Sequence, residues 1–111
     1  MEVTTKEYKS SDLITVNGRI DSYSAPQLAE TLDGLVSNGH YKIVLDMSAV
    51  EFMSSAGLRV MISTQKGCKK HKNGELVLAS VPDRICKALD LAGFTPMFSI
   101  FDDTMDAVGH F

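Results

Sequence analysis

The chain has 111 residues, of which 44% are hydrophobic and 23% are charged, as in an ordinary globular protein of one domain. A formal net charge of -3 gives no electrostatic case for nucleic-acid binding, which usually calls for a basic surface, and no apolar run approaches the roughly 20 residues that span a bilayer. The two cysteines, Cys68 and Cys86, are too far apart for a metal cluster or a redox pair. Because the N-terminal segment is polar and does not resemble a signal peptide, we expect a cytoplasmic protein.

Two strands are predicted at the start of the chain. Residues 1–10 carry a weak strand signal, and residues 12–20 carry a clearer one because apolar residues alternate along them. The pair Asn17-Gly18 lies too close to the end of the second strand for a hairpin turn, so we interpret it as a bulge or bend. The two strands can pair antiparallel at one edge of a sheet.

The next segment has the clearest helical pattern in the chain. Ser24 is a suitable N-cap, Gln27 stands three residues later as in a capping box, and Pro26 fits the first turn. Asn38-Gly39 ends the helix, since either residue can adopt the left-handed conformation. The apolar stripe of this helix consists of Ala25, Leu28, Ala29, Leu32, Leu35 and Val36.

A second strand–helix pair follows. Residues 41–46 form a short apolar run, which is typical of a strand buried on both faces. Residues 55 to about 72 predict a helix that is closed by Asn73-Gly74. The residues at helical spacing are Leu58, Met61, Ile62, Gln65 and Cys68.

The last part of the chain predicts a strand over residues 75–79, a helix from Pro82 to Gly93, a strand over 97–101 and a short helix over 102–108. The inner face of the helix after Pro82 is expected to carry Ile85, Ala88, Leu89 and Ala92. Strands that alternate with helices indicate an α/β fold. We therefore expect a single domain over residues 1–111, with a mixed, mostly parallel sheet of about four to five strands and about four helices.

Residues 51–58, at the junction of the buried strand and the second helix, are the candidate functional site. A serine at such a junction caps the first turn, which is the simplest interpretation of Ser54 and Ser55. The same position is exposed and lies where a helix N-terminus tolerates negative charge, so Ser55 is also a candidate for regulatory phosphorylation.

A catalytic serine is less consistent with the sequence. Gly57 matches the second glycine of a nucleophile elbow around Ser55, but Met53 stands where the first glycine belongs. None of the histidines, which are His40, His71 and His110, can be placed beside that serine from the sequence. There is no phosphate-binding glycine motif, and the acidic residues lack the spacing of a calcium or two-metal site. We therefore expect no catalytic residue, no cofactor and no metal.

Three segments together resemble a known family. They are Gly18-Arg19-Ile20-Asp21, Leu45-Asp46-Met47-Ser48, and the run from Val50 to Leu58 with its core Phe52-Met53-Ser54-Ser55-Ala56-Gly57-Leu58. The chain resembles the bacterial anti-sigma-factor antagonists, the stand-alone form of the STAS domain, over essentially its whole length. The resemblance implies a STAS-like fold and a regulatory protein that is not an enzyme.

The resemblance also implies a role for each residue of the motif. Ser55 matches the serine that is phosphorylated by a serine-kinase anti-sigma factor, and Asp21 matches an acid that lies close to it at the partner surface. The unphosphorylated protein would bind the kinase and free a sigma factor, phosphorylation would abolish binding, and a metal-dependent serine phosphatase would restore it. The remaining residues of the implied docking motif are Ser54, Ala56, Gly57 and Leu58.

Two departures from the family pattern concern the same motif. Many members have Asp in place of Ser54, and many have Ser or Thr in place of Ala56. A phosphate on Ser55 is expected to meet the like charge of Asp21 and Asp46.

The alternatives to an anti-sigma-factor antagonist are a STAS subunit of a lipid-transport or sensory signalling complex and, from another class, a small serine-dependent enzyme. The identity of the sigma factor and the oligomeric state stay open.

Overall fold

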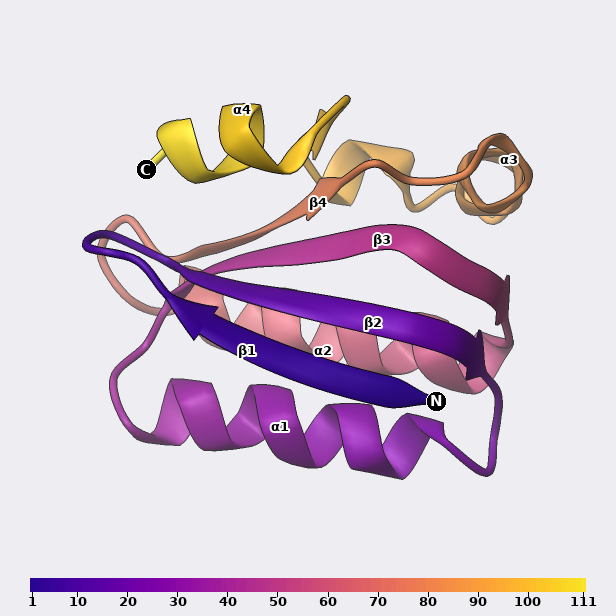
Figure 1. Cartoon of the computed structure of the whole chain (residues 1–111), viewed down its shortest axis with the longest axis horizontal. Helices are drawn as coiled ribbons and strands as arrows, with labels where there is room; N and C mark the ends of the chain where they lie inside the picture. The colour runs from indigo at the N-terminus through magenta and orange to yellow at the C-terminus, as the bar shows by residue number, and fades with distance from the viewer.

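Five strands form one mixed sheet in the order β1-β2-β3-β4-β5 (Figure 1). β1 runs antiparallel to β2, and all other neighbours are parallel, which confirms the predicted sheet and its antiparallel edge. The computed structural model describes all of residues 1–111. The strands are β1 (Glu2–Glu7), β2 (Asp12–Ile20), β3 (Lys42–Met53), β4 (Glu75–Ala79) and β5 (Ile100–Phe101).

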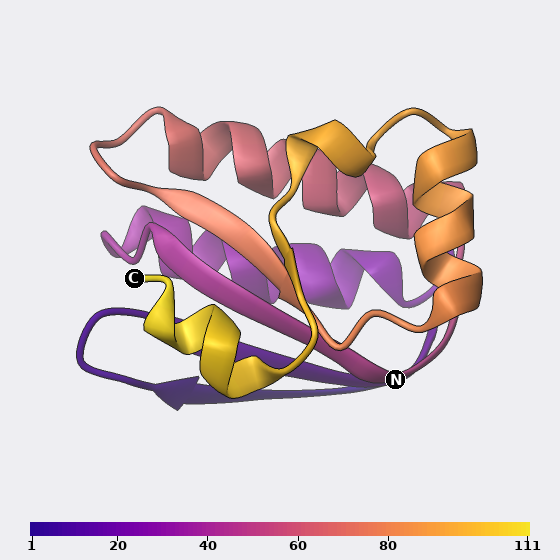
Figure 2. The same ribbon diagram turned by 90° about the horizontal axis from the view of Figure 1, so that it is seen from above.

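Four helices cover the sheet, as the sequence predicts. α1 and α2 lie side by side on one face, α4 lies on the other, and α3 stands at one end beside the sheet (Figures 1 and 2). The helices are α1 (Ala25–Ser37), α2 (Ser55–Lys69), α3 (Asp83–Leu91) and α4 (Thr104–Gly109), with a 3₁₀ turn at Thr95–Met97. None of them combines the length and the apolar character needed to cross a membrane.

The core has two layers because the central strands are buried on both faces. In β3, Ile43 and Leu45 point into the large cluster under α1 and α2, whereas Val44 between them joins a smaller cluster under α4. In β4, Leu76 and Val77 divide in the same way. The continuous apolar runs of the sequence therefore indicate two-sided burial correctly.

β3 is longer than the apolar run predicts, since it continues through Met53 and not only to Asp46. The reason is its pairing with β2, which persists to the pair Ile20 and Met53 despite two shifts of register near Asn17 and Gly18. Gly18 adopts a positive φ of 105°, which confirms the predicted bulge within β2. The strand thus ends at the residue before Ser54.

The predicted capping box at the start of α1 is wrong. Ser24 occupies the N-cap position, but its hydroxyl donates to the carbonyl of Arg19 at 2.8 Å and to the Asp21 carboxylate at 3.1 Å. The side chain of Asp21 instead accepts the Ser24 amide at 3.0 Å. The turn before the helix is therefore organised by Asp21, and Gln27 makes no reciprocal bond to the cap.

Two other boundaries and the buried face of α3 differ from the predictions. α2 ends at Lys69 rather than near residue 72. The last strand is reduced to Ile100–Phe101, because Thr95–Met97 forms a 3₁₀ turn in front of it. On α3, Ile85 and Leu89 are buried as expected, but the other two predicted inner residues, Ala88 and Ala92, are exposed. α3 packs at the end of the sheet, so only a narrow stripe of it is covered.

The short β5 leaves the start of β4 without a strand neighbour on that side, and a side chain takes the place of one. The buried amide of Gln65 accepts the Leu76 amide proton at 2.8 Å and donates to the Leu76 carbonyl at 3.0 Å. The same amide donates to the carbonyl of Met97 at 2.7 Å. Gln65 is only 2% exposed, and its hydrogen bonds satisfy both of its polar atoms.

Candidate functional site at the end of the parallel strands

The candidate site lies where β2 and β3 end together. Ile20 and Met53 are the last paired residues, and the amide of Ser54 donates to the carbonyl of Ile20 at 2.7 Å. The next residues along each chain segment are Asp21 and Ser55. The structure therefore brings the predicted segments that carry Asp21 and Ser55 to the same end of the sheet, on the right-hand side of Figure 1, where α1 and α2 also begin.

Ser54 and Ser55 have different tasks at the start of α2. Ser54 is the N-cap in an extended conformation, and its hydroxyl accepts the amide proton of Gly57 over a long 3.4 Å contact. Ser55 is the first helical residue and is exposed. The capping prediction is confirmed for Ser54, which leaves the Ser55 hydroxyl without a part in the cap and open to solvent.

Gly57 sets how closely α2 approaches the sheet. It is buried, and a Cβ atom at this position would lie 2.6 Å from Cγ2 of Ile20 and 3.2 Å from Cγ of Met53. Both distances are shorter than a normal carbon–carbon contact. The absence of a side chain therefore lets the first turn of α2 rest on the last residues of β2 and β3, which fixes the position of Ser55.

Asp21 is held in a rigid turn beside this junction. Its Oδ1 atom accepts the amide protons of Tyr23 and Ser24, each at 3.0 Å. The hydrogen bond from the backbone of Ser24, followed by that from its side chain, holds the pKa of Asp21 below its usual range. The site therefore presents a fixed negative charge next to the segment that carries Ser55.

Apolar and cationic side chains surround the junction. The Arg19 guanidinium lies over the Phe52 ring at 4.4 Å from its centroid, and Arg84 of α3 donates to the carbonyl of Glu51. Tyr23, in the turn after β2, is 94% exposed. A groove of about 200 Å³ adjoins Ser55 between α2 and α3, and its lining includes Met53, Leu58, Ile85 and Leu89. This rim offers the mixture of aromatic, aliphatic and arginine groups that protein interfaces favour.

One acid expected near Ser55 is placed elsewhere. Asp46 lies within β3, seven residues before the end of the strand, which corresponds to about 23 Å at the usual rise of a strand. Its carboxylate accepts the amide proton of Ser48 at 3.0 Å, so it is hydrogen-bonded within β3 itself. The expectation that Asp46 would add to the charge near Ser55 is wrong, because β3 does not end where its apolar run ends.

No histidine accompanies Ser55. His40 precedes β3 and lies 2.8 Å from Asp12 at the start of β2, and His71 stacks on Tyr41, which also precedes β3. His110 contacts Glu75, the first residue of β4, at 3.0 Å. All three therefore lie at the edge where the parallel strands begin, whereas Ser55 lies where they end. The arrangement does not supply a base for a serine nucleophile.

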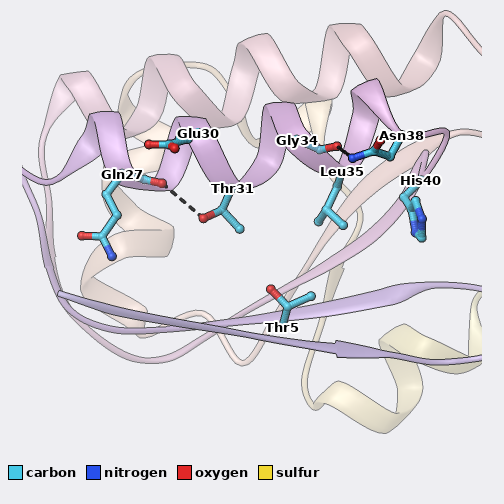
Figure 3. A pocket seen from close by; sticks show the side chains of 8 residues that line it. All are labelled: Thr5, Gln27, Glu30, Thr31, Gly34, Leu35, Asn38 and His40. Carbon is cyan, nitrogen blue, oxygen red and sulfur yellow. Dashed lines mark hydrogen bonds between the residues drawn. The ribbon is translucent and has the colours of Figure 1, made fainter.

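The hollow between α1 and β1 is not a comparable site. Thr31 donates to the carbonyl of Gln27 at 3.3 Å, and Asn38 donates to that of Gly34 at 2.8 Å (Figure 3). These polar side chains are bound to the helix that carries them and do not converge on a common point (Figure 3). The hollow therefore lacks the convergent polar groups of a ligand site.

Sequence reasoning did not identify the rim of the junction. Tyr23, Phe52 and Arg84 are far apart in the sequence, by 29 and 32 positions, and only the pairing of β2 with β3 and the position of α3 bring them to one end of the sheet. The linear signal at Tyr23 is weak, since a single aromatic residue in a polar turn is common. No spacing rule connects it with Arg84.

Comparison with known proteins bears on this geometry. The family model described as the STAS domain matches residues 2–107. The chain belongs to the STAS domain family. Among curated proteins, the anti-sigma-F factor antagonist RsfB of Mycobacterium tuberculosis is 30% identical over 107 residues, which are 96% of this chain and 85% of RsfB. This similarity confirms the family that the motif around Ser55 indicates.

Solved structures agree with the fold of this STAS domain. The structure of an anti-sigma factor antagonist from Mycobacterium paratuberculosis has a TM-score of 0.88 at 24% identity, covering 98% of this chain and 92% of that one. The Bacillus cell fate determinant SpoIIAA in its phosphorylated form has a TM-score of 0.78 at 14% identity, covering 98% of both chains. At these identities the likeness shows the common fold.

Proposed function

We propose that this STAS domain, over residues 1–111, is an anti-sigma-factor antagonist that binds a serine-kinase anti-sigma factor through the edge where β2 and β3 end. The observation that carries the proposal is the exposed hydroxyl of Ser55 at the first residue of α2, free of the capping role. Support also comes from RsfB, an antagonist of an anti-sigma factor that is similar over nearly the whole chain. Binding of the unphosphorylated form releases the sigma factor.

Phosphorylation of Ser55 acts as a local block of this interface. A phosphate adds roughly -1.5 to -2 charges. The backbone bond between Ser54 and Ile20 keeps this charge near the ionised Asp21, so the edge changes from a small hydroxyl to a bulky anion. The helix N-terminus tolerates negative charge, so the fold persists while the partner is excluded. A metal-dependent serine phosphatase reverses the block, because the exposed position admits a second enzyme.

The predicted docking residues divide into three groups in this proposal. Asp21, Ser55 and the half-buried Ala56 face the partner. Ser54 and Gly57 act indirectly, since one caps α2 and the other allows its close approach to Ile20. Leu58 borders the groove with α3 and supplies apolar contact. The protein is not an enzyme in this scheme, because Ser55 accepts a phosphate and has no histidine beside it.

The test is phosphorylation and binding with a purified serine-kinase anti-sigma factor and ATP. We expect wild type to gain one phosphate and Ser55→Ala to gain none, with mass spectrometry of the intact protein as the measurement. Ser54→Asn is the matched control, because asparagine keeps the N-cap and removes the neighbouring hydroxyl. It should be phosphorylated like wild type. A phosphate that persists in Ser55→Ala and disappears in Ser54→Asn would contradict the assignment.

Binding is tested separately with non-phosphorylatable variants. Ser55→Ala should bind the kinase, and Ser55→Asp should bind it at least about tenfold more weakly, the change that corresponds to roughly 1.4 kcal/mol. Ser63→Asp adds the same charge to an exposed position on the same helix and should bind like wild type. Equal affinity of Ser55→Asp and wild type would contradict the local block. Capture of transporter or sensory-complex subunits by all variants alike would support the alternative STAS assembly.

A further inference from the structure

Three side chains of the types that can bind a metal ion meet at the opposite end of the sheet from Ser55, where the parallel strands begin. The Nδ1 atom of His40 lies 2.8 Å from Oδ2 of Asp12 and 4.0 Å from Oε2 of Glu7. The three ligand atoms lie within 4.8 Å of one another. They come from the end of β1, the start of β2 and the loop between α1 and β3, so residues distant in the sequence converge here.

We propose that Glu7, Asp12 and His40 form a binding site for a divalent transition-metal ion. Zinc bonds to imidazole nitrogen and carboxylate oxygen are about 2.0–2.2 Å long, which places two ligands of a tetrahedral ion about 3.4 Å apart. The two measured separations from His40 Nδ1, 2.8 and 4.0 Å, lie on either side of that value. Side-chain adjustments of a fraction of an ångström therefore suffice.

A second observation at the same place points to a ligand. Ser11 lines the same cavity as the three side chains and is only 5% exposed. Its hydroxyl oxygen is the one buried side-chain polar atom of the protein that makes no hydrogen bond. Buried hydroxyls are normally paired, so the cavity that holds the three side chains also holds an unsatisfied polar group, as expected where a ligand belongs. The simple ion pair of His40 with Asp12 leaves this hydroxyl unexplained.

The composition of the cavity limits the kind of ion. Lys9, Lys42 and Lys72 also line it, so positive charge at the rim opposes a cation held by electrostatics alone. Hard cations such as Mg²⁺ and Ca²⁺ prefer oxygen ligands, so the imidazole of His40 would contribute little to their binding. Zinc and its neighbours in the first transition row bind imidazole well, so the site favours them. The ion would join the β1–β2 hairpin to the loop before β3.

The test is calorimetric titration of the full chain with zinc chloride. We expect one saturable site in wild type, and an affinity at least about tenfold weaker in Glu7→Gln, since even second-shell losses cost 10–100-fold. Glu7 is exposed, so this variant should remain folded. His40→Gln should weaken binding at least as much. His110→Gln is the matched control, because His110 pairs with a single carboxylate, that of Glu75, and it should bind like wild type.

Two readouts that do not depend on partner binding locate the ion. Zinc should raise the midpoint of thermal unfolding of wild type but not that of Glu7→Gln. Amide chemical-shift changes should be confined to residues 7–12 and 39–42. Absence of saturable binding at millimolar zinc, equal affinity in all four proteins, or shift changes centred on Cys86 would each overturn the proposal. Because this edge is remote from Ser55, failure here leaves the proposed function intact.

Discussion

The amide of Ser54 donates a 2.7 Å hydrogen bond to the carbonyl oxygen of Ile20, so β2 and β3 stay joined up to the residue before Ser55. This bond couples the turn that contains Asp21 to the first turn of α2. A change that moves α2 away from Ile20 should therefore move the Ser55 hydroxyl relative to Asp21.

Gly57→Ala is expected to disturb that coupling. The new methyl group would lie 2.6 Å from Cγ2 of Ile20, an atom fixed close to the backbone of a buried β-branched residue. We expect the free energy of unfolding to fall by about 1–3 kcal/mol, the usual cost of overpacking, and kinase binding to weaken with it. Urea denaturation and calorimetric binding would measure the two effects.

Gly67→Ala is the control for the same substitution in the same helix. Its Cβ would meet nothing closer than Cγ1 of Val36 at 3.8 Å. Alanine in a helix interior is favoured over glycine by about 0.5–1 kcal/mol, so this variant should be more stable than wild type. Loss of stability in both variants would show that the contact with Ile20 is not the cause.

The cap of α2 should be separable from the phosphorylation site. Ser54→Ala removes the hydroxyl that accepts the Gly57 amide and should lower stability by about 0.5–1 kcal/mol, at the small end of the range because the contact is 3.4 Å long. Ser55→Ala should change stability by less than that, since Ser55 has no part in the cap. Chemical denaturation of the two variants gives the comparison, and the reverse order would contradict the assigned roles.

The pH dependence of the free energy of unfolding should reflect the ionisation of Asp21. Its lowered pKa means that the folded protein keeps this carboxylate ionised where the unfolded chain, with the ordinary pKa of 3.8, takes up a proton. The stabilisation by its charge is therefore complete above the ordinary pKa and is lost as pH falls through the lower folded value. Asp21→Asn keeps an uncharged acceptor, so its stability deficit relative to wild type should be constant near neutral pH and shrink below pH about 4.

Gln65→Met should be among the most damaging substitutions remote from the site. It removes the amide that pairs with both backbone groups of Leu76 and with the carbonyl of Met97. Leaving such groups buried and unpaired costs about 1–3 kcal/mol each, so we expect a loss of about 2–4 kcal/mol after partial relaxation. Lys66→Met, the exposed neighbour, should stay within about 0.5 kcal/mol of wild type. Equal stability of both variants would contradict the bridging role.

The sequence indicates those parts of the fold that local physics controls. α1 and β4 follow their apolar patterns, and Asn38-Gly39 ends the helix as expected. The length of β3 depends on its partner, because β2 continues the pairing past Asp46, and no local signal reports this. The sequence predicts a cap of α1 formed by Ser24 and Gln27. In the structure the preceding turn is fixed by Asp21, whose carboxylate accepts the Ser24 amide proton that Gln27 would accept in a capping box.

The candidate site was predictable in its centre and not in its surroundings. Ser54 and Ser55 stand at a strand–helix junction that the apolar run before them and the helical spacing after them predict. The rim formed by Arg19 and Phe52, and the cluster of Glu7 with His40, depend on which strands are neighbours. Such contacts join residues that are 33 positions apart in both cases, and no spacing rule covers that range.

The bond pattern of Gln65 has a consequence for how this protein can associate with others. Exposed strand edges recruit strands from other chains, and that route leads to swapped or fibrous aggregates. At Leu76 the Gln65 amide already occupies the backbone groups that an incoming strand would use. On the other side of the sheet the outer strand is β1, and its charged residues Glu2, Lys6 and Glu7 discourage the addition of a further strand there. Other proteins are therefore expected to bind through side-chain contacts, and not by adding a strand to the sheet.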